Sequence, residues 1–206
     1  MAGMTNVPDR YSSVAKALHW TIALLILTLI PAGLIMHNMP FGETKFLIYQ
    51  VHKSFGLMVL MLAVFRLVWR LTHPVPPLPE NLKAWEKVAA RITHVGFYVI
   101  MVGIPLIGWA MVSSAPIGIP TKLFFLIPVP HFPLPQSEPL YEVLLSSHKY
   151  MAFATLGLLV LHVGAALKHH VVLLDDVLLR MMPRPVADFL DRRRSLPFIK
   201  PEDDQA

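Results

Sequence analysis

Four apolar runs of about 20 residues dominate this 206-residue sequence. A run of that length crosses a hydrocarbon core of roughly 30 Å as an α-helix. Inside a bilayer the backbone must satisfy its own hydrogen bonds, which leaves few other folds open. The chain is only 15% charged, whereas a soluble domain has about 25%. We therefore predict an all-α integral membrane four-helix bundle, with spans near residues 18–37, 50–70, 92–112 and 148–170.

The basic residues alternate between the two ends of the predicted helices. They are sparse in the first and third connections and frequent before the first span, around the second connection and after the fourth span. This is the positive-inside pattern of a multi-pass protein with both termini in the cytoplasm. It accounts for the net charge of +5 without a nucleic-acid partner.

Two further boundaries follow from composition. The four-helix domain is expected to occupy residues 1–184, and residues 185–206, which mix basic and acidic side chains, are expected to form a mobile cytoplasmic tail. The connection 113–147 is rich in proline yet apolar, so we expect it to lie in the outer interface and cover whatever binds there. Residues 84–91 are expected to form a short interfacial turn.

The chain contains no cysteine. This excludes disulfides, iron–sulfur clusters and thiolate zinc sites. It also excludes the covalent attachment of c-type haem, which needs two cysteines. Any haem must be held non-covalently, by histidine or methionine.

The fourth span carries His148 and His162, which are 14 positions apart. On an α-helix this separation is roughly 21 Å of rise, with both side chains within about 40° of one face. Because neighbouring helices run in opposite directions, His52 shares the outer level with His148, and His19 shares the inner level with His162. One intramembrane histidine often makes only an interhelical hydrogen bond. Two pairs at matched depths favour two bis-histidine b-type haems.

Other side chains near these levels each have more than one interpretation. Lys53 and Lys149 follow the outer histidines, where they can attract an anionic donor, neutralise haem propionates or contact headgroups. Arg66 and Arg70 can pair with inner propionates or simply fix topology.

His94 and His169 lie at the inner ends of the third and fourth spans. They can line an inner quinone pocket or reach the membrane interface. The residues alone leave both readings open.

Several ordered motifs resemble the bacterial cytochrome b561 family over residues 10–184. They are Arg10-Tyr11 with Leu18-His19-Trp20, His52-Lys53-Ser54-Phe55-Gly56-Leu57, Arg66-Leu-Val-Trp-Arg70, His94 with Pro105-Leu106-Ile107-Gly108, His148 with His162, and Leu178-Leu-Arg-Met-Met-Pro183. The resemblance implies a dihaem protein of the bacterial inner membrane. It puts His52 and His148 on the outer haem, His19 and His162 on the inner haem, and His94 and His169 near a ubiquinone site.

The resemblance also suggests an activity. Superoxide oxidases of this family pass electrons from superoxide at the periplasmic face to ubiquinone. Our leading hypothesis is such an oxidoreductase, with superoxide or another outer-face donor. The first alternative is a cytochrome b anchor subunit that relays electrons from a partner dehydrogenase or hydrogenase. The second, a metal or proton transporter, is disfavoured because the four predicted spans contain no Asp or Glu. The sequence leaves the oligomeric state open.

Overall fold

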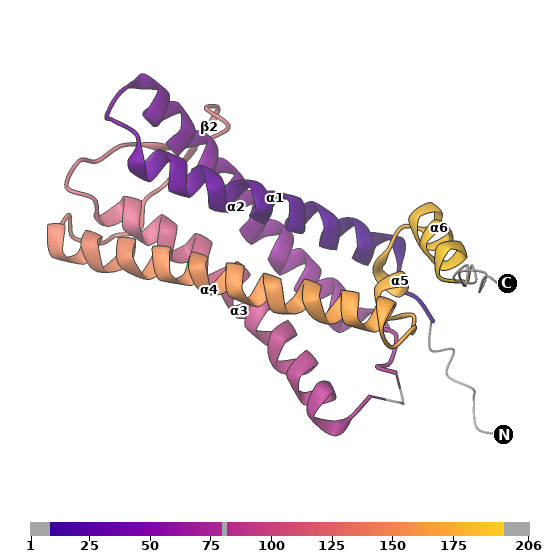
Figure 1. Ribbon diagram of the computed structural model, residues 1–206. Coiled ribbons are helices and arrows are strands. Elements are labelled where there is room, and N and C mark those ends of the chain that lie inside the picture. Colours follow the sequence, from indigo (N-terminus) through magenta and orange to yellow (C-terminus); the bar gives the residue numbers. More distant parts are fainter. Residues whose placement is uncertain (1–8, 80–81, 196–206) are drawn as a thin grey trace, which may run out of the picture.

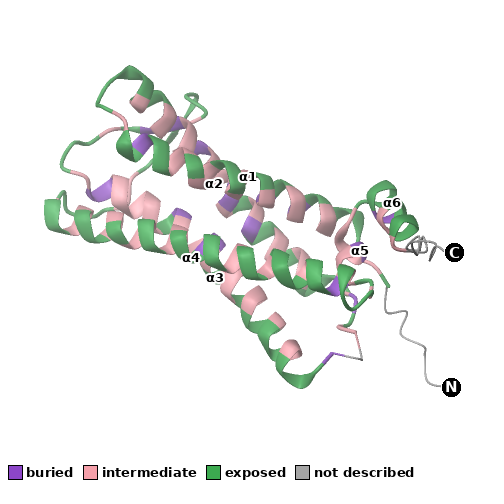
Figure 2. Cartoon of the chain, in the orientation of Figure 1, coloured by how far each residue is buried: buried purple, intermediate pink, exposed green. Residues whose placement is uncertain are grey.

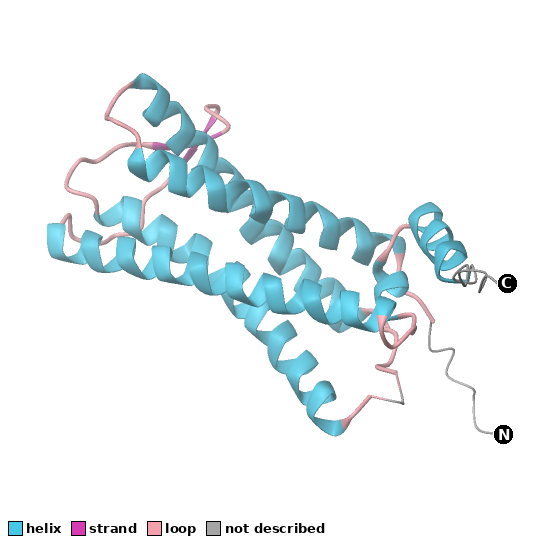
Figure 3. Ribbon diagram, viewed as in Figure 1, coloured by secondary structure: helices cyan, strands magenta, loops and turns pink. Residues whose placement is uncertain are grey.

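The computed structural model describes residues 9–79 and 82–195. In this part of the chain, four helices are long and apolar enough to cross a membrane, which confirms the predicted fold class (Figure 3). The elements are α1 (Ser13–Asn38), α2 (Glu43–Thr72), α3 (Ala84–Ser114), β1 (Thr121–Leu123), β2 (Ile127–Val129), α4 (Glu138–Val171), α5 (Val177–Met181) and α6 (Arg184–Ser195).

The long helices form an up-and-down bundle. Along the chain, α1 packs on α2, α2 on α3, and α3 on α4. In Figure 1, α1 begins and α4 ends at the same end of the bundle, where α5 and α6 also lie. Histidines near the start of α1 and the end of α4 therefore occupy one level, as the alternation of direction predicts.

Little of this bundle is buried in protein. In each long helix, at most 11% of the apolar 18-residue stretch is buried within the protein. Exposed residues cover the outer faces (Figure 2). A small core of buried side chains consists of Ile22, Ala63 and Met101, which come from α1, α2 and α3. Apolar side chains that face outward suit a lipid solvent.

The helices are longer than the apolar runs. α4 begins at Glu138, ten residues before His148. His148 was expected at the start of the helix and instead lies inside it. Residues 84–91, expected as a separate turn, are the first two turns of α3. Polar first turns such as those containing Glu86 and Glu138 continue each helix into the headgroup region, which hydropathy does not detect.

The outer connection contains a small hairpin fastened to α2. At its tip, Phe124 and Phe125 have φ of 48° and 64°, a left-handed conformation that disfavours bulky side chains. The buried Ser54 hydroxyl accepts the Phe124 N–H at 2.9 Å, and the Gln50 amide donates to the Pro120 carbonyl at 2.9 Å. These bonds from α2 hold the hairpin beside the outer half of the bundle.

The cytoplasmic end, as the topology prediction assigns it, is closed by α5 and α6. Trp20 of α1 donates to the Met181 carbonyl at 3.1 Å. Arg194 of α6 donates to the Asp175 carbonyl and pairs with Asp176. Its hydrogen bonds, first that to Asp176, raise the pKa of Arg194. Residues 185–195 of the expected tail belong to α6, while 196–206 lie outside the described residues.

We expect Ser54→Ala to loosen the hairpin. The change removes the acceptor of the Phe124 N–H and leaves a buried polar group unpaired, at a cost of about 1–3 kcal/mol. Hydrogen exchange of residues 121–129 should accelerate and the melting temperature should fall. Ser147→Ala is the matched control, because that hydroxyl bonds only to the Val143 carbonyl of its own helix. Equal exchange in both variants would contradict the assignment.

Candidate functional site: two facing histidine pairs

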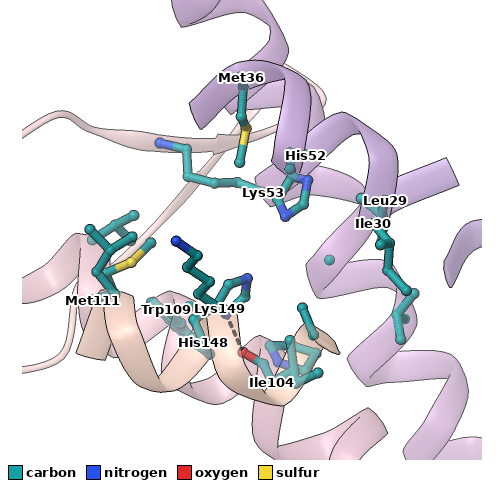
Figure 4. Close-up of a pocket in the computed structure, with 18 of the residues that line it drawn as sticks. Leu29, Ile30, Met36, His52, Lys53, Ile104, Trp109, Met111, His148 and Lys149 are labelled. Carbon is teal, nitrogen blue, oxygen red and sulfur yellow. Dashed lines mark hydrogen bonds between the residues drawn. The ribbon is translucent and has the colours of Figure 1, made fainter. Parts of the chain in front are cut away.

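The outer pair consists of His52 on α2 and His148 on α4, which face each other across a cavity (Figure 4). Their ring centroids are 6.2 Å apart. An axial metal–nitrogen bond is about 2 Å long, and each imidazole adds roughly 1 Å from its nitrogen to its centre. Two such ligands on one iron therefore place the centroids about 6 Å apart, which fits the observed separation.

The inner pair consists of His19 on α1 and His162 on α4. Their centroids are also 6.2 Å apart. His94 of α3 lies 5.9 Å from the His162 ring, and Phe97 lies 5.3 Å from it, edge on. The spacing of the inner rings therefore also fits one iron between them. The two pairs are separated by 14 positions along α4.

Two glycines let the other helices approach the outer rings. A Cβ at Gly108 of α3 would lie 3.1 Å from His148 Cε1, tighter than normal contact, and a Cβ at Gly33 of α1 would lie 3.5 Å from His52 Cε1. In the sequence motifs, Gly108 appears only at the end of Pro105-Leu106-Ile107-Gly108, and Gly33 appears in none of them. The sequence feature that could have identified both glycines is their depth, because each lies on a neighbouring helix at the level of an outer histidine.

Backbone orients one outer ligand. The Nδ1–H of His148 donates to the Ile104 carbonyl at 3.1 Å, which leaves Nε2 for the cavity. Such a bond fixes the ring and increases its basicity as a ligand. His52 differs, because its Nδ1 is buried with no hydrogen-bond partner among the described residues.

The two predicted outer lysines have different surroundings. Both line the cavity. The Lys53 ammonium donates to the Pro120 carbonyl at 3.3 Å, which ties it to the hairpin. In Figure 4 the Lys149 side chain points into the space between the two helices, beside His148. Lys149 is therefore the lysine that presents its charge to the cavity.

Arg66 and Arg70 project from the inner half of α2. Arg66 donates to the Ala15 carbonyl of α1 at 2.6 Å and lines a small pocket with Tyr98 of α3. Its charge acts on both His19 and His162. Arg70 acts on His94 and lines a small inner pocket together with Arg66.

The structure does not bring the two predicted quinone residues into one described contact. His94 lies against the inner pair, whereas the buried His169 hydrogen-bonds through Nδ1 to the Asp175 carboxylate. Asp175 also accepts the Val177 N–H. Sequence reasoning missed Asp175 because a carboxylate beside a predicted membrane end reads as an ordinary loop residue.

The arrangement has the chemistry of a b-type cytochrome. Neutral imidazoles from different helices face each other in the interior of a membrane bundle, which is how such proteins hold haem. Within the described residues, no cluster of three or more His, Cys, Asp and Glu residues offers a competing metal site. The fold and the site therefore define a membrane haem protein of the electron-transfer type.

Comparison with known proteins gives the family. A family model for prokaryotic cytochrome b561 matches residues 10–184, and this chain belongs to that family. It is 30% identical to cytochrome b561 homolog 2 of Escherichia coli strain K12 over 187 residues, 90% of this chain and 97% of the relative. It is 30% identical to homolog 1 of the same strain over 178 residues, 85% and 98% of the two chains.

A third relative carries a functional name. The chain is 29% identical to the probable superoxide oxidase CybB of Yersinia pestis over 180 residues, 85% of this chain and 97% of the relative. Family membership establishes a membrane-embedded electron-transfer haem protein and implies b-type haem. It does not by itself choose the electron donor and acceptor.

The tilt between paired rings predicts a spectroscopic signature. The ring planes meet at 66° in the outer pair and 60° in the inner pair. Strongly crossed axial imidazoles leave two iron d orbitals close in energy, so the ferric protein should give low-spin electron paramagnetic resonance signals with an unusually large maximum g value. Nearly parallel rings would give ordinary rhombic spectra, and that result would contradict the geometry.

Proposed function

We propose that this chain is a dihaem cytochrome b of the bacterial inner membrane that transfers electrons from superoxide at the periplasmic face to ubiquinone. The observation that carries the proposal is the repetition of one geometry at two depths: two histidine pairs, each with centroids 6.2 Å apart. Their members on α4 are 14 positions apart, roughly 21 Å along the helix.

The two depths have a clear use in an insulating bilayer. His52 and His148 would hold the outer haem, and His19 and His162 the inner one, so the crossing is divided into short steps. Bound haem supplies the one-electron chemistry, and the chain supplies ligation, burial and nearby charge. The basic residues at the end where α1 begins and α4 ends support placing that end in the cytoplasm.

The outer entrance suits a small anion. Lys53 and Lys149 line the cavity that contains the outer pair, and clustered positive charge raises the rate at which anions arrive. Each superoxide loses one electron and leaves as dioxygen. Two electrons and two protons convert one ubiquinone to ubiquinol, so two superoxides are consumed per quinone.

The inner end supports quinone reduction. His94 lies beside the inner pair, and Asp175 holds the Nδ1–H of the buried His169. A histidine oriented by a carboxylate is suited to holding a proton on its other nitrogen, Nε2, and passing it to a quinone oxygen. Arg66 and Arg70 would pair with the inner haem propionates.

Replacement of the four histidines tests the pairing. We expect His52→Ala and His148→Ala to remove the same haem, and His19→Ala and His162→Ala to remove the other, because each change leaves its axial partner alone. Pyridine haemochrome analysis should give two haems per chain in the parent and one in each variant. His37→Ala, at the outer end of α1, should retain both. A single haem in the parent, or loss of the same haem from His19→Ala and His52→Ala, would contradict the proposal.

The lysines provide the test of the donor. Superoxide should reduce the haems in stopped-flow mixing, more slowly as ionic strength rises, because salt screens steering. Lys149→Gln should lower this rate several-fold with haem content intact. Lys53→Gln should have the smaller effect, since its ammonium is engaged by the Pro120 carbonyl. Haems that superoxide fails to reduce, but a co-purifying dehydrogenase does, would assign the chain as an anchor subunit.

A further inference from the structure

We infer that the two histidine sites are electrostatically unequal, with the inner haem made easier to reduce by Arg66 and the outer haem made harder to reduce by the Ile104 carbonyl. The inference rests on the two-haem part of the proposed function and gives the direction of electron flow. Nothing in it depends on which molecule donates or accepts the electrons.

Arg66 is fixed between three helices at the inner level. It extends from α2, donates to the Ala15 carbonyl of α1 at 2.6 Å and lines a small inner pocket with Tyr98 of α3. The ion pairs of the described residues do not include it, so no protein carboxylate neutralises this guanidinium there. Its charge reaches both His19 and His162.

A fixed cation favours the reduced state of a nearby haem. The ferric form carries one more positive charge than the ferrous form, so an adjacent positive charge repels the ferric form more strongly. Arg66 is only partly exposed, and partly buried charges are screened less by water and salt than exposed ones. The inner haem should therefore gain electron affinity from Arg66, even where a propionate offsets part of the charge.

The outer site is biased in the other direction. The Nδ1–H of His148 donates to the Ile104 carbonyl at 3.1 Å, which gives the ring more anionic character and makes Nε2 a stronger donor. Stronger axial donation stabilises ferric iron. In the described residues, neither His19 nor His162 makes a hydrogen bond of this kind through Nδ1.

The outer lysines do not reverse this order. Lys149 is exposed, so its charge is screened by solvent. Lys53 donates to the Pro120 carbonyl at 3.3 Å, which engages its ammonium with the hairpin.

The inequality directs the electron. With haem held at both pairs, the charge of Arg66 and the His148–Ile104 hydrogen bond would favour transfer of one electron from the outer site to the inner site. Electrons that enter from the periplasmic side then collect at the cytoplasmic level, next to His94.

A redox titration of the fully loaded protein tests the inference. The two midpoints are assigned with His148→Ala, which should retain the inner haem alone. The inner midpoint should be the higher one in the parent. Arg66→Gln should lower the inner midpoint by about 59 mV, a tenfold change in a one-electron equilibrium, and leave the outer one in place. Arg66→Lys, which keeps the charge, and Lys83→Gln, which removes an exposed charge from the start of α3, should leave both midpoints near the parent values.

Gly108→Ala tests the outer half independently. Its Cβ would lie 3.1 Å from His148 Cε1 and 3.2 Å from Nδ1, so it should push the ring from the Ile104 carbonyl and raise the outer midpoint. This variant decides the matter if Arg66→Gln does not retain the inner haem.

An outer midpoint above the inner one in the parent overturns the inference. The inference is also overturned if Arg66→Gln leaves both midpoints unchanged. It is overturned as well if Lys83→Gln lowers the inner midpoint as much as Arg66→Gln does. None of these results depends on superoxide or ubiquinone, so failure here leaves the proposed substrates intact, and failure of the substrates leaves this inference intact.

Discussion

The high cost of an unpartnered imidazole inside a bilayer governs this structure. Polar side chains at membrane depth are retained where they face a bundle interior and bind something. Here four histidines meet in two pairs, each with the spacing that one axially ligated iron requires. The small apolar core at Ile22, Ala63 and Met101 lies between the levels. The outer pair lines a cavity between the helices, whereas His94 and Phe97 pack against His162 of the inner pair.

The pairing could be predicted from the sequence because it depends only on period and direction. A helix of 3.6 residues per turn places His148 and His162 on one face, and antiparallel neighbours bring His52 and His19 to matching depths. The early starts of α3 and α4 could not be predicted, since polar turns that continue a helix into headgroups carry no hydropathy signal. The roles of Gly33 and Asp175 were missed for another reason: each depends on which helix or loop lies opposite.

The outer connection shows how a proline-rich segment is held against a helix. Its backbone groups hydrogen-bond to Gln50, Lys53 and Ser54 of α2. The same helix carries His52. The hairpin is thus attached to the helix that carries an outer histidine, and Lys53 is partly committed to that attachment. This leaves Lys149 as the lysine suited to meeting an incoming anion.

A partly buried arginine is costly, and its position decides whether the cost has a function. If Arg66 served topology alone, any site on the inner end of α2 would do, and an exposed one would cost less. Instead the guanidinium is held between α1 and α3, where its charge reaches both inner histidines. The outer pair has a carbonyl oxygen in the corresponding role. If both pairs hold haem as proposed, opposite partial charges beside two similar sites would give the two cofactors different electron affinities.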